Sequence, residues 1–216
     1  PVYALIIAAF IPRQRVGAFN LQGLMLFTLY VAGIVSNPPA SVERQAGFAR
    51  ILAEQGYDLR FTRDLDVART YLRERYADSP DARYGIVASS RDKDLVRFGV
   101  MNDFQSTKVL RYGTWYGDDE RQPGSRSCRL LHDCVTEFGA QGLELDATLL
   151  AWGSDFLLAD GRWSIGRARG YKRGGPKVRD PWQLRANAYR VLLTRARDAT
   201  IIFVPRLLEL DETYAY

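Results

Sequence analysis

Short apolar runs alternate with amphipathic segments along most of the chain. Helices are expected at residues 20–34, 41–57, 64–78 and 181–196, of which the first is apolar nearly throughout and the others are amphipathic. Strands are expected at residues 1–10, 57–61, 82–90, 146–152 and 199–204, of which 57–61 is a short strand of mixed sequence and the others are apolar. Strands that alternate with helices predict an α/β fold in layers, with a mostly parallel sheet.

Polar residues mark several helix ends. Asn20 can cap the first helix, and Ser41 can cap the second, which ends at Gly56. The most apolar stretch of the chain covers residues 21–35, which is short of the roughly 20 residues that a bilayer requires. We therefore expect a buried helix there and no membrane partner.

The remaining segments have weaker patterns. A short helix is expected after residue 91, and a strand within 128–138. Residues 102–127 are rich in aromatic residues, Gly and Pro, and we expect them to be irregular. Residues 153–180 are polar and basic, which predicts a long basic loop inserted between the strand at 146–152 and the helix at 181–196.

One arginine conflicts with the amphipathic pattern of the helix at 181–196. Leu184, Ala188, Val191 and Leu192 fall on one apolar face, and Arg195 falls on the same face at the end of the helix. Arg190 and Arg197 fall on the other side. The helix alone favours a structural ion pair for Arg195, with Asp198 or Glu144 as the partner.

A turn rich in glycine joins two predicted strands at 135–153. Gly139 and Gly142 allow a ligand to approach the backbone closely. Gln141 and Glu144 flank the turn and can bond a sugar hydroxyl or a phosphate oxygen. Ligands gather at strand ends in α/β sheets, so we expect this turn at the ligand-binding edge.

Taken together, these two segments resemble the last two motifs of superfamily 1 helicases. The first motif is QGLELD at 141–146, and the second is YRVLLTRAR at 189–197. The longer stretches TEFGAQGLELD and AYRVLLTRARDA are most similar to a Schlafen-like group of bacterial DNA/RNA helicases. The resemblance is specific over residues 130–205 and looser over residues 1–100.

The resemblance implies a RecA-like three-layer domain, the second of two that enclose ATP in a DNA/RNA motor. Arg195 then matches the arginine finger that reaches the γ-phosphate, at the cleft between the domains on the ligand-binding edge. Arginine suits this task because it stays charged and offers a planar fork to phosphate oxygens. Arg15, within RQR at 13–15, is the candidate for a second arginine at the γ-phosphate.

The resemblance also assigns roles around the glycine turn and elsewhere. Glu144 matches the position that holds the ribose, and Gly142 is the glycine of the motif. Gln141 stands where many relatives have lysine, so its contact with the nucleotide is open. Positions that touch the nucleic-acid backbone in such helicases are matched by Thr136, Ser89, Ser90 and Arg91.

The parts of an ATP site that bind phosphate and metal are missing from the sequence. No G-x-x-x-x-G-K-[ST] motif occurs, and no apolar strand ends in an Asp-Glu pair. The domain therefore lacks its own phosphate loop, and ATP with Mg²⁺ would need an N-terminal RecA-like domain. Since the chain begins at Pro1, we interpret residues 1–216 as the C-terminal helicase domain of a larger protein, inactive by itself.

The charge of the chain permits a nucleic-acid partner. The net charge is +5, and cations crowd residues 161–180 together with Trp163 and Tyr171. Cations suit phosphates and aromatic rings suit unpaired bases, so we expect single-stranded DNA or RNA as the partner. The candidate contacts in this loop are Arg167, Arg169, Lys172 and Arg173. A non-enzymatic nucleic-acid-binding module that uses this loop is the alternative function.

Other functions receive less support. Cys128 and Cys134 lie near the single histidine, His132, without a usual zinc spacing, so we expect buried thiols in a reducing cytoplasm and no metal site. A nuclease would need a cluster of carboxylates. The candidates for it are Glu137, Glu144, Asp146 and Asp155. An interaction domain with decayed motifs remains open.

Overall fold

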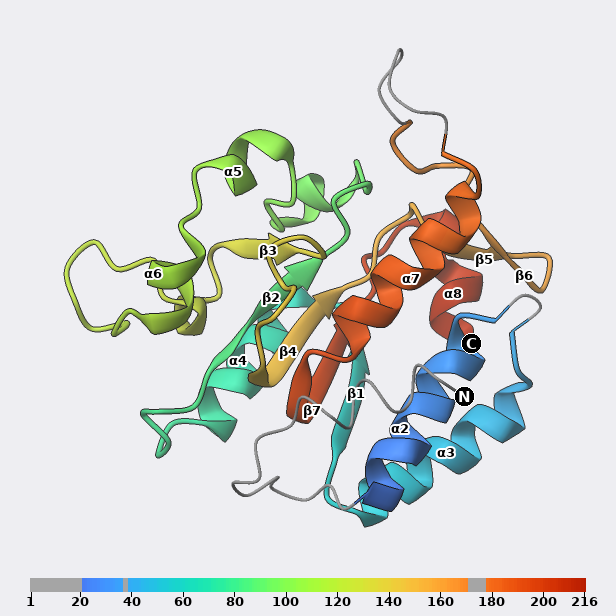
Figure 1. The fold of residues 1–216 in the computed structure, drawn as a ribbon, viewed down its shortest axis with the longest axis horizontal. Helices are drawn as coiled ribbons and strands as arrows, with labels where there is room; N and C mark the ends of the chain where they lie inside the picture. The colour runs from blue at the N-terminus through green and yellow to red at the C-terminus, as the bar shows by residue number, and fades with distance from the viewer. Residues whose placement is uncertain (1–20, 37–38, 171–177) are drawn as a thin grey trace.

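A computed structural model describes residues 21–36, 39–170 and 178–216, with side chains described from residue 27 onward (Figure 1). The strand expected at 1–10 and the cap expected at Asn20 lie outside these residues. The helix that follows is present as α2 (Leu21–Ile34). None of the helices within the described ranges has the length and hydropathy needed to cross a bilayer.

Five parallel strands form the central sheet in the order β1-β7-β4-β2-β3. Their bounds are β1 (Asp58–Thr62), β2 (Tyr84–Ala88), β3 (Cys134–Thr136), β4 (Leu145–Ala151) and β7 (Ala196–Phe203). Leu149 lies opposite Ile201 on one neighbouring strand and Ile86 on the other. All five strands therefore end at one edge of the sheet, the carboxyl edge, and begin at the opposite edge, the amino edge.

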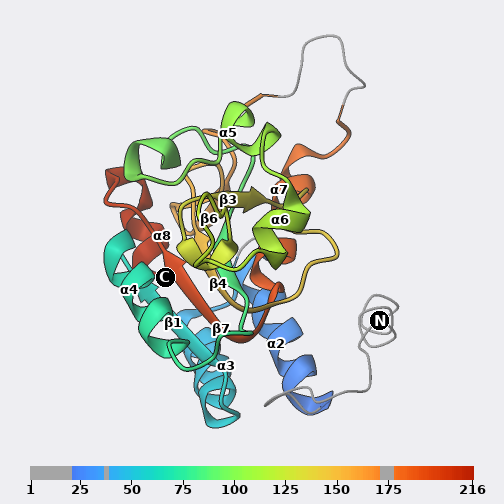
Figure 2. The same ribbon diagram turned by 90° about the vertical axis from the view of Figure 1, so that its left-hand side faces the viewer.

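Helices cover both faces of this sheet. The longer ones are α2, α3 (Val42–Glu54), α4 (Leu65–Arg75) and α7 (Pro181–Leu193), and α8 (Asp211–Ala215) is short. α2 and α7 pack on one face, whereas α4 packs on the other (Figures 1 and 2). The domain is thus the three-layer α/β fold of RecA-like type that the sequence predicts.

Alternate side chains of the central strands point to opposite layers. Leu150 and Ile202 pack among the residues beneath α2 and α7. Leu149 and Ile201, one position earlier on each strand, pack beneath α4. Strands that are buried on both faces read as continuous apolar runs, which is why the runs in the sequence located them.

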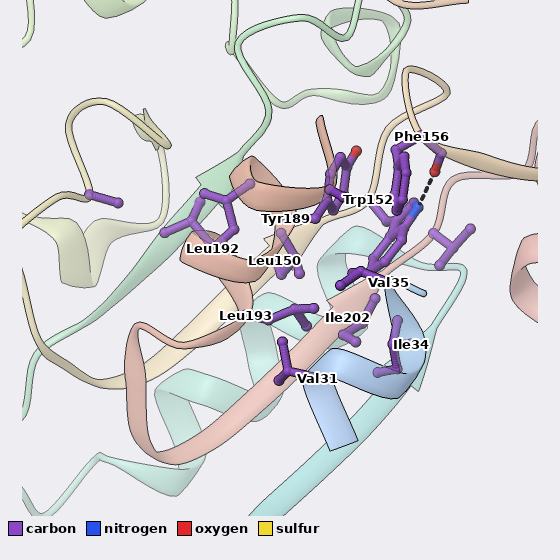
Figure 3. Close-up of a cluster of buried hydrophobic side chains, with 14 of the residues drawn as sticks. Val31, Ile34, Val35, Leu150, Trp152, Phe156, Tyr189, Leu192, Leu193 and Ile202 are labelled. Atoms are coloured by element: carbon purple, nitrogen blue, oxygen red, sulfur yellow. Dashed lines mark hydrogen bonds between the residues drawn. The ribbon is translucent and has the colours of Figure 1, made fainter. Parts of the chain in front are cut away.

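An aromatic cluster fills the core beside α7. Trp152 packs against Tyr189 with ring centroids 4.5 Å apart, and Phe156 stacks on Trp163 at 4.7 Å. The Trp152 indole donates a hydrogen bond to the carbonyl of Phe156 at 2.6 Å (Figure 3). The buried indole of Trp163 likewise donates to the carbonyl of Ile34 at 2.5 Å.

This cluster corrects the prediction of one basic loop at 153–180. Residues 153–158 are buried, and β5 (Leu157–Ala159) pairs with β6 (Arg162–Ser164) in an antiparallel hairpin. Trp163 is only 3% exposed, so it is not available to stack on a nucleic-acid base. The pattern was misleading because a hairpin of three-residue strands is too short to show periodicity.

The segment at 102–127 is more regular than expected. It contains α5 (Phe104–Lys108) and α6 (Tyr112–Gly117), which lie beside β3 (Figure 2). Short 3₁₀ turns occur at Leu95–Phe98, Cys128–Leu130 and Leu208–Leu210. Trp115 of α6 is fully buried and anchors the segment to the sheet.

Both cysteines are free and buried, as expected. Burial raises the pKa of the Cys128 thiol to about 11, so the thiol stays protonated at neutral pH. A reactive thiolate is therefore not available at this position.

Replacing Gly85 tests the packing of Trp115 on the sheet. A Cβ at Gly85 would lie 2.5 Å from the indole ring, so we expect Gly85→Ala to lower the free energy of unfolding by about 1–3 kcal/mol. Gly47→Ala in α3 is the control, since its Cβ meets no atom within 4 Å and should raise stability by about 0.5–1 kcal/mol. Urea unfolding measures both, and equal effects would contradict this packing.

Candidate functional site

The buried face of α7 is rotated from the predicted one. Arg185, Tyr189 and Leu192, spaced by one helical turn each, are buried, whereas Leu184 is 42% exposed. The helix ends at Leu193, so Arg195 lies just beyond it and not on its apolar stripe. Hydrophobic spacing could not find this face because a charged residue, Arg185, belongs to it.

Arg185 forms a buried ion-pair network at the carboxyl edge. Its guanidinium pairs with Glu137 at 2.9 Å and with Asp155 at 3.1 Å, and it also donates to the Ser89 hydroxyl. Ser89 in turn donates to Asp155. These side chains come from α7 and from the segments that follow β2, β3 and β4, so one arginine ties four parts of the fold together.

Neighbouring groups complete the network. The Tyr189 hydroxyl donates to Asp155 at 2.7 Å and accepts from the Gly153 amide at 3.1 Å. Glu137 accepts from both the amide and the hydroxyl of Ser90 at 2.8 Å. Burial raises the pKa of Asp155, while its bonds to Ser89 and Arg185 act in the opposite direction.

Arg195 lies half-buried at the amino edge, where it forms no ion pair with any residue that the structure describes. Its guanidinium donates to the carbonyl of Val191 at 2.9 Å and to the carbonyl of Leu143 at 3.4 Å. Within the described ranges no carboxylate reaches ion-pair distance, so the pairs considered with Asp198 or Glu144 are not formed. Burial lowers the pKa of Arg195, and the nearby charge of Glu144 opposes that shift.

The glycine turn meets Arg195 directly. The amide of Leu145 donates to the carbonyl of Arg195 at 2.9 Å, so the segments that precede β4 and β7 are neighbours. Gly142 has a φ of 79°, a conformation that glycine adopts at little cost. Gln141 and Glu144 are exposed beside it. The structure therefore brings together Arg195, Gln141, Gly142 and Glu144.

This group does not lie at the edge that the sequence suggested. The chain leaves β3 at Thr136 on the carboxyl edge and crosses to the amino edge, where β4 begins at Leu145. Glu144 and Arg195 immediately precede β4 and β7, so both lie at the amino edge. The prediction that this turn lies at the carboxyl edge was therefore wrong. The chain crosses between the edges within eight residues, 137–144, and no helical pattern in the sequence indicated the crossing.

The predicted nucleic-acid contacts lie at the opposite, carboxyl edge. Thr136 is 5% exposed and Ser89 is fully buried, with its hydroxyl bonded inside the network. Ser90 is half-buried against Glu137. In this conformation, Arg91 presents more surface than Ser89 to a nucleic acid.

The start of the basic loop is bonded to the turn at Ser89–Arg91, which follows β2. The Arg169 amide donates to the carbonyl of Arg91 at 2.8 Å, and the Arg91 guanidinium donates to the carbonyl of Gly170 at 3.1 Å. Arg167 forms ion pairs with Asp94 at 3.0 Å and Glu209 at 2.6 Å. The other predicted residues, Arg15, Lys172 and Arg173, lie outside the described residues.

The four carboxylates considered for a nuclease lie in two separate pairs. Glu137 and Asp155 share Arg185 at the carboxyl edge, whereas Asp146 pairs with Arg197 at 2.5 Å near the amino edge, beside Glu144. Within the ranges described, no group of three or more potential metal ligands occurs. These residues therefore do not form a two-metal cluster here.

Sequence reasoning missed Arg185, Tyr189 and Asn102. Asn102 is buried, and its amide donates to the carbonyls of Ser89 and Asp92 at 2.8 and 3.1 Å. The four-residue spacing of Arg185 and Tyr189 was the available signal, but a charged residue does not count as apolar in a periodicity analysis.

Comparison with known proteins identifies one family. The profile described as Schlafen group 3, DNA/RNA helicase domain, matches residues 39–206. No curated protein and no solved structure matches the chain. The match covers more than half of the chain and includes both edges described above.

Removing the Arg185 charge tests the network. We expect Arg185→Met to lower the free energy of unfolding by about 3–5 kcal/mol, because Glu137 and Asp155 would remain buried without a cation. Arg190→Met on the same helix is the matched control, since the Arg190 guanidinium bonds an exposed asparagine, Asn187, and forms no ion pair with any described residue. Its effect should stay within about 0.5 kcal/mol in denaturant unfolding. Equal losses in the two variants would show that the network is not what stabilises this edge.

Proposed function

Because the chain belongs to the Schlafen group 3 family of DNA/RNA helicase domains, we propose that it is the C-terminal RecA-like half of an ATP-dependent DNA/RNA motor. In this role the amino edge receives the nucleotide, and the carboxyl edge receives the nucleic acid. The placement of Arg195 carries the proposal.

Arg195 is a partly buried cation that no carboxylate of the described residues neutralises, so it can bind an anion. Its guanidinium is held by carbonyl oxygens of Val191 and Leu143, which orient it without neutralising its charge. Partial burial removes water from the cation, so a phosphate that approaches it gains more than at an exposed arginine. A γ-phosphate that develops charge during transfer would be stabilised in this way.

The turn beside Arg195 supports a nucleotide in particular. Glu144 is exposed next to it and can accept hydrogen bonds from ribose hydroxyls. Gly142 leaves open space where a side chain would stand, and nothing lies within 4 Å of its Cβ position. Gln141 offers an amide at the same place. We assign the phosphate loop and the Mg²⁺ ligands to an N-terminal RecA-like domain, because the sequence has neither.

The non-enzymatic nucleic-acid-binding module remains the second candidate. The specific observation in its favour is the attachment of the basic loop to the turn at Ser89–Arg91 through Arg169 and Gly170. This attachment gathers cations at the carboxyl edge whether or not ATP binds at the other edge.

ATP hydrolysis with Arg195→Ala tests the lead proposal. In the intact protein that carries both RecA-like domains, we expect ATP hydrolysis that nucleic acid stimulates. The variant should lose a hundredfold or more of the rate, on the order of the losses known for arginine fingers. Arg195→Lys should recover little, because lysine lacks the planar fork.

Arg190→Ala is the control for this assay, since it removes a nearby arginine whose guanidinium bonds Asn187 of its own helix. Thermal unfolding of each variant verifies that it is folded. A normal rate in folded Arg195→Ala, or no hydrolysis by the intact protein, would contradict the role of Arg195.

Neutralising the basic loop separates the two candidates. We expect the triple variant Arg169→Gln, Lys172→Gln and Arg173→Gln to bind nucleic acid more weakly and with a smaller dependence on salt, because fewer counterions are released. In the motor, ATP analogues should also change the affinity for nucleic acid. Affinity that depends on the loop but never on nucleotide would favour the binding module.

A further inference from the structure

The helix α6 contacts the glycine turn at two points. The ring of Tyr112 packs on Gly139, where a Cβ would lie 2.5 Å from it. One helical turn later, the Tyr116 hydroxyl donates to the carbonyl of Glu144 at 2.8 Å. The residue proposed to hold the ribose is therefore bonded, through its backbone, to a segment for which the sequence indicated no function.

α6 is itself fixed to the sheet. Trp115 lies over Gly85 of β2 and has no contact with water. The Tyr116 ring is half-buried and packs against the same core as Leu143 of the turn. Burial raises the pKa of the Tyr116 hydroxyl, and the charge of Arg197 opposes that shift. The hydroxyl therefore keeps the proton that it donates at neutral pH.

Three successive residues of the turn have bonded backbone groups. The carbonyl of Leu143 accepts from the Arg195 guanidinium at 3.4 Å, and the amide of Leu145 donates to the Arg195 carbonyl at 2.9 Å. The carbonyl of Glu144, between them, accepts from Tyr116. The backbone is thus held from α6 on one side and from the end of α7 on the other, while the Glu144 side chain is exposed.

The glycines of the turn make this support necessary. Glycine leaves the backbone wide conformational freedom, and ordering a loose turn costs binding free energy. At Gly142 no described atom lies within 4 Å of the Cβ position, so packing does not fix the turn there. At Gly139 the Tyr112 ring fills the place of a side chain, so the ligand approach expected there is blocked by protein. The open part of the backbone is at Gly142.

We propose that Tyr116 is a positioning residue for the nucleotide, whose bond to the Glu144 carbonyl fixes the backbone from which the Glu144 carboxylate reaches the ribose hydroxyls. Tyr116 does not touch the nucleotide in this role. A glutamate side chain has several rotatable bonds, and a small displacement of its backbone moves the carboxylate away from its target. This inference rests on the proposed function, since it adds a residue to the same nucleotide site.

ATP hydrolysis by the intact protein, with nucleic acid present, tests this role. Tyr116→Phe keeps the ring and removes the hydroxyl. We expect it to raise the KM for ATP by roughly 2- to 10-fold, as the loss of one hydrogen bond between neutral groups would, and to change kcat less than about twofold. The rate is spared because Arg195 keeps its bond to the carbonyl of Val191.

Nucleotides that lack a ribose hydroxyl separate positioning from a purely structural role. Wild type should favour ATP over 2′-deoxy-ATP or 3′-deoxy-ATP, and Tyr116→Phe should lose part of that preference. In a Glu144→Ala background, Tyr116→Phe should raise KM no further, because the carboxylate that it positions is gone. A structural defect would persist in that background and would affect all three nucleotides alike.

Tyr216→Phe is the matched control. Its hydroxyl also donates to a backbone carbonyl, that of Ala40, at 3.0 Å, but at the end of α8. It should leave the KM of all three nucleotides unchanged, and thermal unfolding verifies that each variant is folded.

Three results would overturn the positioning and leave the ATP-dependent motor standing. They are an unchanged KM in folded Tyr116→Phe, a loss that persists in the Glu144→Ala background, and wild type that distinguishes neither deoxynucleotide from ATP. Intact protein that hydrolyses no ATP would overturn the positioning and the proposed function together.

Discussion

The buried guanidinium of Arg185 is the interaction on which the carboxyl edge depends. Two carboxylates, Glu137 and Asp155, and the hydroxyl of Ser89 have almost no contact with water, and Arg185 is the cation that satisfies them. A buried charge without a partner is far more costly than a buried pair, so each element must keep its position for the others to be stable. The segments after β2, β3 and β4 are thereby fixed relative to α7.

The same helix connects the two candidate sites. α7 has 13 residues, or about 20 Å of helix, with Arg185 near its beginning and Arg195 just after its end. The group proposed to hold nucleic acid lies at the first of these ends, and the group proposed to hold nucleotide lies at the second. In a motor these two sites have to communicate. α7 therefore lies between the two candidate sites, with side-chain bonds to each edge.

The sequence predicted the layers of the fold well. Apolar runs located β2, β4 and β7, because strands buried on both faces are apolar at nearly every position, whereas β1 is a half-exposed edge strand with a mixed sequence. Ser41 correctly marked a helix start, since its side chain accepts from the amide of Arg44. The short hairpin of β5 and β6 and the helices α5 and α6 were not found. They have too few residues for periodicity, and tertiary contacts such as that of Trp115 stabilise them.

The residues near the candidate nucleotide site could also be predicted from the sequence, because they lie in two local motifs. The way in which the two motifs contact each other could not be predicted from their spacing. Residues 141–144 and Arg195 are about fifty positions apart, and their contact depends on β4 and β7 being neighbours in the sheet. The sequence by itself therefore determined the elements, the family resemblance and the identity of the motif residues. Only the tertiary structure decided which edge of the sheet they occupy, that Arg195 has no anionic partner within the described residues and that Arg185 does, because strand order and helix rotation arise from packing across the whole domain.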